Sequence, residues 1–188
     1  MELIKNYYEH FCALTGNFFN DKNNICQLQK IINILEQTRE NNSIIYIIGN
    51  GGSSAIAEHA AIDFTKNAGL KSLAVSGTPM LTTFSNDYGY ENVYKKPLEI
   101  FGRTNDILIA ISSSGTSRNI LNACSVAREK GFKIITLSGF EENNPLRKMG
   151  DINLWVNSKA FGFLEILHGL ILHYINDSII GSEVYMIR

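Results

Sequence analysis

Residues 43–63, SIIYIIGNGGSSAIAEHAAID, decide the fold of this chain. Ser43–Ile48 is short, apolar and largely β-branched, which is typical of a buried strand. Gly49–Ser53 is then a glycine-rich turn, and a helix begins near Ala55. Such a unit binds anions, because the backbone can approach closely and the first helical N–H groups point at the ligand. The alternative is a strand–helix turn that needs glycine only for its own geometry.

A second strand and turn of the same kind follow later in the chain. Asp106–Ile111 (DILIAI) is typical of a buried strand, and SSSGTS at residues 112–117 precedes a helix over residues 118–130. One hydroxyl would be explained by N-capping, but five in six residues exceed what a cap needs. Neither turn fits the lysine-containing nucleotide P-loop or G-x-G-x-x-G. The two turns therefore predict a site for a phosphate monoester, and a sugar phosphate is the ligand that they favour.

Two groups of polar side chains indicate metal binding or acid–base chemistry. His59 and Asp63 are four residues apart and share one helical face. Near the C-terminus, Glu165 and His173 lie roughly 80° apart on a helical projection, whereas His168 leans to the other side. Histidines and carboxylates can bind a divalent metal or act as acid and base. Taken alone, each histidine can also be explained as a hydrogen-bonded structural residue, and this explanation is strongest for His168. Spacing does not show that the two groups of side chains meet in the folded chain.

Composition excludes several classes of protein. The chain has 188 residues with a formal net charge of −1 and no basic cluster, so nucleic acid is not an expected partner. Its three cysteines are scattered, which favours reduced thiols and a cytoplasmic location. The N-terminal residues do not read as a signal peptide. Polar residues interrupt the apolar segment 161–180, so no membrane span is expected.

The order of elements predicts an α/β fold. After two helices over residues 2–19 and 22–41, helices alternate with strands at 43–48, 73–75, 106–111, 133–137 and 152–156. Two of these helices are expected over residues 80–84 and 91–102, with a turn at 85–90 between them. This alternation predicts a flavodoxin-like, doubly wound sheet of five parallel strands, with ligands at the carboxyl ends of the strands. We expect one domain over residues 1–188. The aromatic residues in 1–42 favour either a subunit interface or packing onto the same domain.

Several motifs together resemble the bacterial phosphoheptose isomerases of the SIS (sugar isomerase) domain family. They are GNGGS, AEHAAID, SNDYGY, ISSSGTS and E-x-x-H-x-x-x-x-H, in the family's order and over essentially the whole chain. The resemblance implies an SIS domain and an enzyme that converts sedoheptulose 7-phosphate to D-glycero-D-manno-heptose 7-phosphate for surface polysaccharides. It also implies a cytoplasmic homotetramer with active sites at subunit interfaces, in which residues 1–42 contribute to the interface.

The resemblance assigns roles to individual residues. It implies one Zn²⁺ per active site, bound by His59, Asp63, Glu165 and His173. Asp63 and His173 would also be the catalytic acid–base pair. The residues implied in substrate binding are Asn50, Gly51, Gly52, Ser53, Asp63, Asn86, Asp87, Ser112, Ser113, Ser114, Ser117 and Glu165.

This chain departs from the family pattern at four positions. Asp63 stands where the family has glutamate, Glu165 where it has glutamine, Asn67 where it has arginine, and Gly162 where it has an acidic residue. These departures leave the isomerase class in place but leave the sugar open.

Two rival functions remain. One is a non-catalytic scaffold, like the relatives that associate with the replication initiator, and the other is a regulatory sensor of sugar phosphates. The scaffold relatives lack the base carboxylate and the second late histidine, whereas this chain has Asp63 and His173. The enzyme is therefore the favoured hypothesis.

Overall fold

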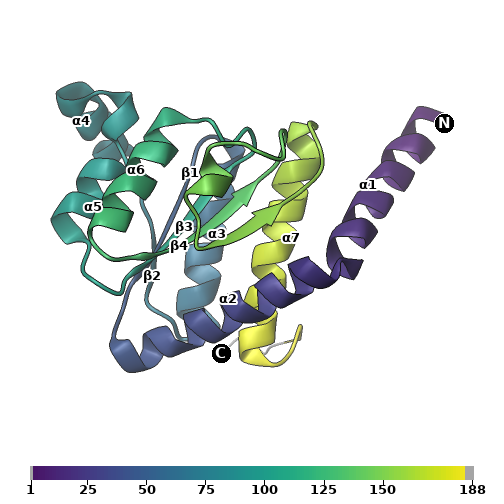
Figure 1. Cartoon of the computed structure of the whole chain (residues 1–188), viewed down its shortest axis with the longest axis horizontal. Coiled ribbons are helices and arrows are strands. Elements are labelled where there is room, and N and C mark those ends of the chain that lie inside the picture. Colours follow the sequence, from purple (N-terminus) through teal and green to yellow (C-terminus); the bar gives the residue numbers. More distant parts are fainter. Residues whose placement is uncertain (1, 185–188) are drawn as a thin grey trace.

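A five-stranded parallel β-sheet lies at the centre of the chain (Figure 1). The structure is a computed structural model and describes residues 2–184. The strands are arranged in the order β2-β1-β3-β4-β5. Their bounds are β1 Ile45–Gly49, β2 Ser72–Ala74, β3 Ile107–Ser112, β4 Lys133–Ser138 and β5 Ile152–Trp155. The predicted doubly wound sheet of five parallel strands is confirmed.

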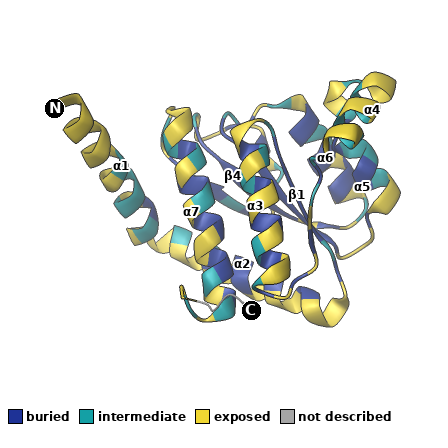
Figure 2. Cartoon of the chain, turned by 180° about the vertical axis from the view of Figure 1, so that it is seen from behind, coloured by how far each residue is buried: buried dark blue, intermediate teal, exposed yellow. Residues whose placement is uncertain are grey.

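Helices cover both faces of this sheet. Helices α2, α3 and α7 pack on one face, and α5 and α6 pack on the other (Figures 1 and 2). The helices are α1 Glu2–Asn20, α2 Lys22–Asn41, α3 Gly52–Lys66, α4 Thr78–Tyr88, α5 Lys95–Phe101, α6 Arg118–Glu129 and α7 Phe161–Ile180. Two short 3₁₀ helices, η1 Tyr90–Asn92 and η2 Leu146–Lys148, complete the described chain.

Alternation along the central strands divides the core into two clusters. In β1, Ile45 and Ile47 face α2, α3 and α7, whereas Tyr46 and Ile48 face α5 and α6. Successive side chains of a strand point to opposite faces, so a sheet covered on both sides needs continuous apolar strands rather than alternating ones. This explains why the strands read as uninterrupted hydrophobic runs in the sequence.

The structure differs from the sequence prediction around residues 78–102. The helix expected at residues 80–84 extends to Tyr88, so Asn86 and Asp87 lie in its last turn rather than in a loop. The single helix expected over 91–102 is divided into η1 and α5. Pro97 is accommodated because it lies in the first turn of α5, where backbone N–H groups have no helical partner.

Helix α1 projects from the body of the molecule (Figure 2). Its contact with α7 is aromatic: the rings of Tyr7 and Phe11 lie 4.6 Å and 5.6 Å from the ring of Phe163. Leu3 and Ile4 remain 82% and 74% exposed. In the described residues, no helix has the length and apolar character needed to span a membrane.

His168 belongs to the core. It is completely buried on α7, and its Nε2 lies 3.4 Å from the carbonyl oxygen of Ser138. Burial lowers the pKa of His168 to about 4, against a small opposing effect of that backbone contact, so the imidazole is neutral near pH 7. The fold therefore supports the interpretation of His168 as a buried structural residue rather than a metal ligand or an acid–base group.

The buried His168 makes stability depend on pH. The unfolded chain takes up this proton near pH 6.5 and the folded chain only near pH 4, so stability falls as the pH falls between these values. The loss amounts to about 3 kcal/mol. We expect His168→Gln to have a shallower pH dependence of the unfolding free energy than the wild type, measured by urea denaturation from pH 7 to pH 4. His10→Gln, which changes an exposed histidine, is the control and should leave the slope unchanged.

Candidate functional site

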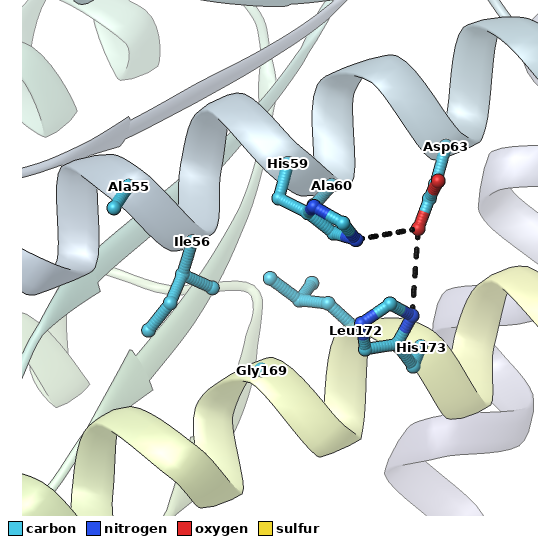
Figure 3. Close-up of a pocket in the computed structure, with 8 residues that line it drawn as sticks. All are labelled: Ala55, Ile56, His59, Ala60, Asp63, Gly169, Leu172 and His173. Atoms are coloured by element: carbon cyan, nitrogen blue, oxygen red, sulfur yellow. Dashed lines mark ion pairs between the residues drawn. The ribbon is translucent and has the colours of Figure 1, made fainter.

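Two helices that are a hundred residues apart in sequence carry the candidate active site. Helices α3 and α7 lie side by side on one face of the sheet (Figure 2). His59 and Asp63 of α3 face His173 of α7 across the groove between the helices (Figure 3). The Nε2 of His59 lies 3.2 Å from Oδ2 of Asp63, and the Nδ1 of His173 lies 3.4 Å from the same oxygen. The structure thus brings together three residues that spacing alone could not connect.

Asp63 is held in place by its own helix. Its Oδ1 accepts a hydrogen bond of 3.1 Å from the side-chain amide of Asn67, one helical turn further on. This leaves Oδ2 for the two imidazoles. Asn67 stands where the resembling family has arginine, so the carboxylate here is oriented by a neutral amide. Sequence reasoning noted the exchange but not this contact.

The three side chains fit a divalent metal ion. One ligand atom from each lies within 4.8 Å of the others. In a tetrahedral zinc site with bonds of about 2.0–2.1 Å, neighbouring ligand atoms are about 3.3 Å apart, which matches the two separations at Asp63. Imidazole and carboxylate are ligands that zinc accepts, and three protein ligands leave one position for a substrate. The cluster opens into a cavity of about 310 Å³ between the two helices.

Glu165 does not join this cluster. It lies eight residues before His173, about 12 Å along the axis of α7. Its carboxylate packs instead over Gly52, where an added Cβ would be 2.4 Å from the carboxyl carbon. Of the four metal ligands implied by the resemblance, His59, Asp63 and His173 therefore lie together, whereas the carboxylate of Glu165 lies apart from them.

The two predicted phosphate turns meet at the carboxyl ends of neighbouring strands. β1 and β3 are paired, and the turns after them line a common cavity of about 90 Å³. The lining residues are Asn50, Ser53, Ile111, Ser112, Ser113, Ser114, Ser117, Phe161 and Glu165. The serines selected by sequence analysis therefore lie together at the carboxyl ends of β1 and β3, and their role in phosphate binding stays a prediction.

The serine hydroxyls are not used as helix caps. Ser117 is the N-cap residue of α6, yet its side chain makes no capping hydrogen bond. The hydroxyls of Ser112 and Ser117 are 3.3 Å apart, and those of Ser114 and Thr116 are 3.0 Å apart. This arrangement favours ligand binding over the N-capping alternative, because hydroxyls can turn their donors toward a phosphate.

The first turn also requires glycine for its shape. Gly51, the N-cap of α3, has φ 54° and ψ −123°, which side chains strongly disfavour. At Gly49, an added Cβ would lie 2.6 Å from the backbone of Ser53. The geometry of the turn thus requires glycine, and two of its residues, Asn50 and Ser53, also line the serine cavity.

Asn50 holds the two turns together. Its amide pairs with that of Asn119 through hydrogen bonds of 2.9 Å and 2.8 Å, and its oxygen accepts from Tyr90 and Tyr94 at 3.0 Å and 3.3 Å. Burial raises the pKa of Tyr94, which keeps its hydroxyl a donor. Sequence reasoning missed Asn119 and Tyr94, because no local motif indicates a partner that is tens of residues away.

The structure leaves Asn86 and Asp87 away from both cavities. They are exposed in α4, and the Nδ2 of Asn86 donates to Oδ1 of Asp87 at 2.8 Å. Neither residue lines the serine cavity or the histidine groove within the described chain. Their predicted role in substrate binding stays a prediction.

Comparison with known proteins agrees with this arrangement. A family model of the SIS domain matches residues 6–139. The phosphoheptose isomerase of Helicobacter pylori (strain Shi470) is 37% identical over 154 residues, which cover 79% of this chain and 80% of that protein. The enzyme of Salmonella paratyphi B is 31% identical over 180 residues and 92% of each chain. The structure of phosphoheptose isomerase from Neisseria gonorrhoeae has a TM-score of 0.88 at 27% identity, covering 96% of this chain and 98% of that one.

The fold and the extent of these matches define the class of protein: the chain belongs to the SIS-domain family. Within that family it belongs to the phosphoheptose isomerases, which are enzymes of the aldose–ketose isomerase type.

The positive φ of Gly51 predicts a cost for any side chain at this position. We expect Gly51→Ala to lower the free energy of unfolding by about 1–3 kcal/mol in chemical denaturation, because alanine is strained at this positive φ. The loss stays in this range because no neighbouring atom lies within 4 Å of the added Cβ. The matched control is Gly16→Ala within α1, which should stabilise the protein by about 0.5–1 kcal/mol. Equal effects of the two substitutions would contradict this account of the turn.

Proposed function

We propose that the protein isomerises sedoheptulose 7-phosphate to D-glycero-D-manno-heptose 7-phosphate. The observation that carries this proposal is the spacing of its two cavities along α3. His59 follows Gly52 by seven residues, about 10 Å along the helix axis. An extended seven-carbon sugar phosphate spans about 9 Å from its carbonyl end to phosphorus. A heptose phosphate held at the serine turns therefore presents its reactive end to His59, Asp63 and His173.

The reaction moves a proton between neighbouring carbons through an enediol. Asp63 removes the carbon-bound proton, which exchanges with solvent on the carboxyl group, and then delivers a proton to the adjacent carbon, while His173 supplies and receives the proton on oxygen. Asn67 keeps Oδ2 of Asp63 turned toward the groove throughout these steps. The serine hydroxyls and the N–H groups at the start of α3 hold the phosphate end.

We further propose that one Zn²⁺ binds His59, Asp63 and His173. When bound, zinc would polarise the substrate carbonyl and stabilise negative charge on its oxygen. The donor set and the separations around Oδ2 of Asp63 support this assignment.

We also propose a homotetramer, with α1 in the interface. Leu3, Ile4, Tyr7 and Tyr8 form an exposed apolar surface on a projecting helix. A surface of this kind is typical of an interface. The serine cavity is lined by no Lys, Arg or His of the described chain, so a neighbouring subunit is the natural source of a cation for the phosphate.

The isomerase proposal is tested by NMR of sedoheptulose 7-phosphate in D₂O, with and without Zn²⁺. We expect an aldoheptose 7-phosphate that carries deuterium at C2. Asp63→Asn should lower kcat by at least about 100-fold, because the amide cannot accept the proton. The control Glu129→Gln should retain full activity, since Glu129 is exposed at the end of α6 and lines neither cavity.

The other outcomes are equally informative. Turnover that survives complete removal of zinc would overturn the metal assignment but not the isomerase. Binding of the sugar phosphate without any product would support the sensor or scaffold function instead.

The tetramer is tested by sedimentation velocity. We expect the wild type to sediment as a tetramer and the double variant Leu3→Glu/Tyr8→Glu as smaller species, because two charges would enter an apolar contact. Ser125→Glu, which adds a charge on the exposed side of α6, is the control and should leave the tetramer intact. A wild type that sediments as a monomer would rule out the proposal.

A further inference from the structure

A carboxylate lines the cavity that should receive the phosphate. Glu165 lines the serine cavity together with Ser53 and the residues of the second turn. Its two carboxylate oxygens lie 2.4 Å and 2.6 Å from the position of a Cβ at Gly52, so the group rests directly on the first residue of α3. This is the helix end at which an anion is stabilised.

The Glu165 carboxylate is not part of a structural hydrogen-bond network in the described chain. No hydrogen bond or ion pair within the described chain engages its carboxylate, although Lys and Arg residues elsewhere pair with Glu99 and Asp151. The residues that line the cavity carry no positive charge. The polar groups nearest to it are the start of α3 and the serine hydroxyls, and these are also the groups that would bind phosphate.

A phosphate in this cavity would lie directly beside the Glu165 carboxylate, because the free volume that this side chain lines is only about 90 Å³. Like charges repel at such short range. Binding of phosphate therefore favours a position of the carboxylate away from the cavity.

We propose that Glu165 is an internal competitor for the phosphate site, which links phosphate binding to occupancy of the metal cluster. This inference rests on the proposed function, because it takes the serine cavity as the phosphate site. It concerns a residue at which this chain differs from its family, since the family has an uncharged glutamine there.

The groove between α3 and α7 offers the side chain a place to go. Gly169 follows Glu165 by one helical turn on α7 and lines the cavity beside His173. No atom lies within 4 Å of a Cβ added at Gly169, so this part of the groove is open. A carboxylate turned over Gly169 approaches the cluster of His59, Asp63 and His173 and leaves the serine cavity free.

A divalent cation at the cluster favours the turned-out position of Glu165 by attraction. Phosphate at the serine turns favours the same position by repulsion. Each ligand thereby strengthens binding of the other, and the two effects are equal because the coupling between two binding sites is reciprocal. Substrate loading then depends on the metal through Glu165.

The test measures binding of inorganic phosphate by calorimetry, with and without one equivalent of Zn²⁺. Without zinc, we expect Glu165→Gln to bind phosphate about tenfold more tightly than the wild type, because the competing charge is gone. Zinc should strengthen phosphate binding at least fivefold in the wild type and clearly less in Glu165→Gln. The matched control is Glu58→Gln, which removes the same charge from an exposed position on α3 and should behave like the wild type.

The outcomes separate this inference from the proposed function. Equal phosphate affinities of the wild type and Glu165→Gln without zinc would overturn the role of Glu165 and leave the sugar-phosphate site in place. The same zinc effect in both proteins would overturn the coupling. No phosphate binding by any of the folded variants, as judged by circular dichroism, would overturn both the inference and the proposed phosphate site.

Discussion

The packing of α3 against α7 is the contact on which the candidate site depends. Helix α3 carries the start of the anion cavity at Gly52 and two members of the polar cluster, His59 and Asp63. Helix α7 supplies His173 to that cluster and Glu165 to the cavity. Both helices are held on the sheet by one apolar cluster, which also contains Phe64 and Leu172. Apolar burial therefore sets the distance between groups that would not approach each other through polar attraction alone.

Asp63 is the central residue of the polar cluster between the two helices. A single oxygen faces both imidazoles, and the other is engaged by Asn67. A carboxylate held in this manner is pre-organised, and pre-organisation is what proton transfer and metal binding both require. The shorter aspartate and the neutral Asn67 replace the glutamate and arginine of the resembling family. We interpret them as a compensating pair, because the amide contact keeps the shorter side chain directed at the groove.

Charge is distributed unevenly along the groove. The polar cluster contains the histidines, while the serine cavity contains a carboxylate and no cation from the described chain. In the proposed binding mode, the phosphate of the sugar lies at the end of the groove that already holds Glu165. We propose that this opposition lets Glu165 set how phosphate and metal affect each other.

The sequence by itself determined the class of fold and the chemistry of both turns. The reason is that buried parallel strands, glycine at positive φ and a helix start after each strand are local features with local physical causes. It also determined that His59 and Asp63 share a face, since that follows from the helical repeat. Only the tertiary structure decided that His173 meets them, that His168 is buried in the core and that Glu165 lies over Gly52. These contacts depend on how α3 and α7, which are a hundred residues apart in sequence, pack on one face of the sheet. Such packing is determined by side-chain shapes across the whole core and not by any local sequence pattern.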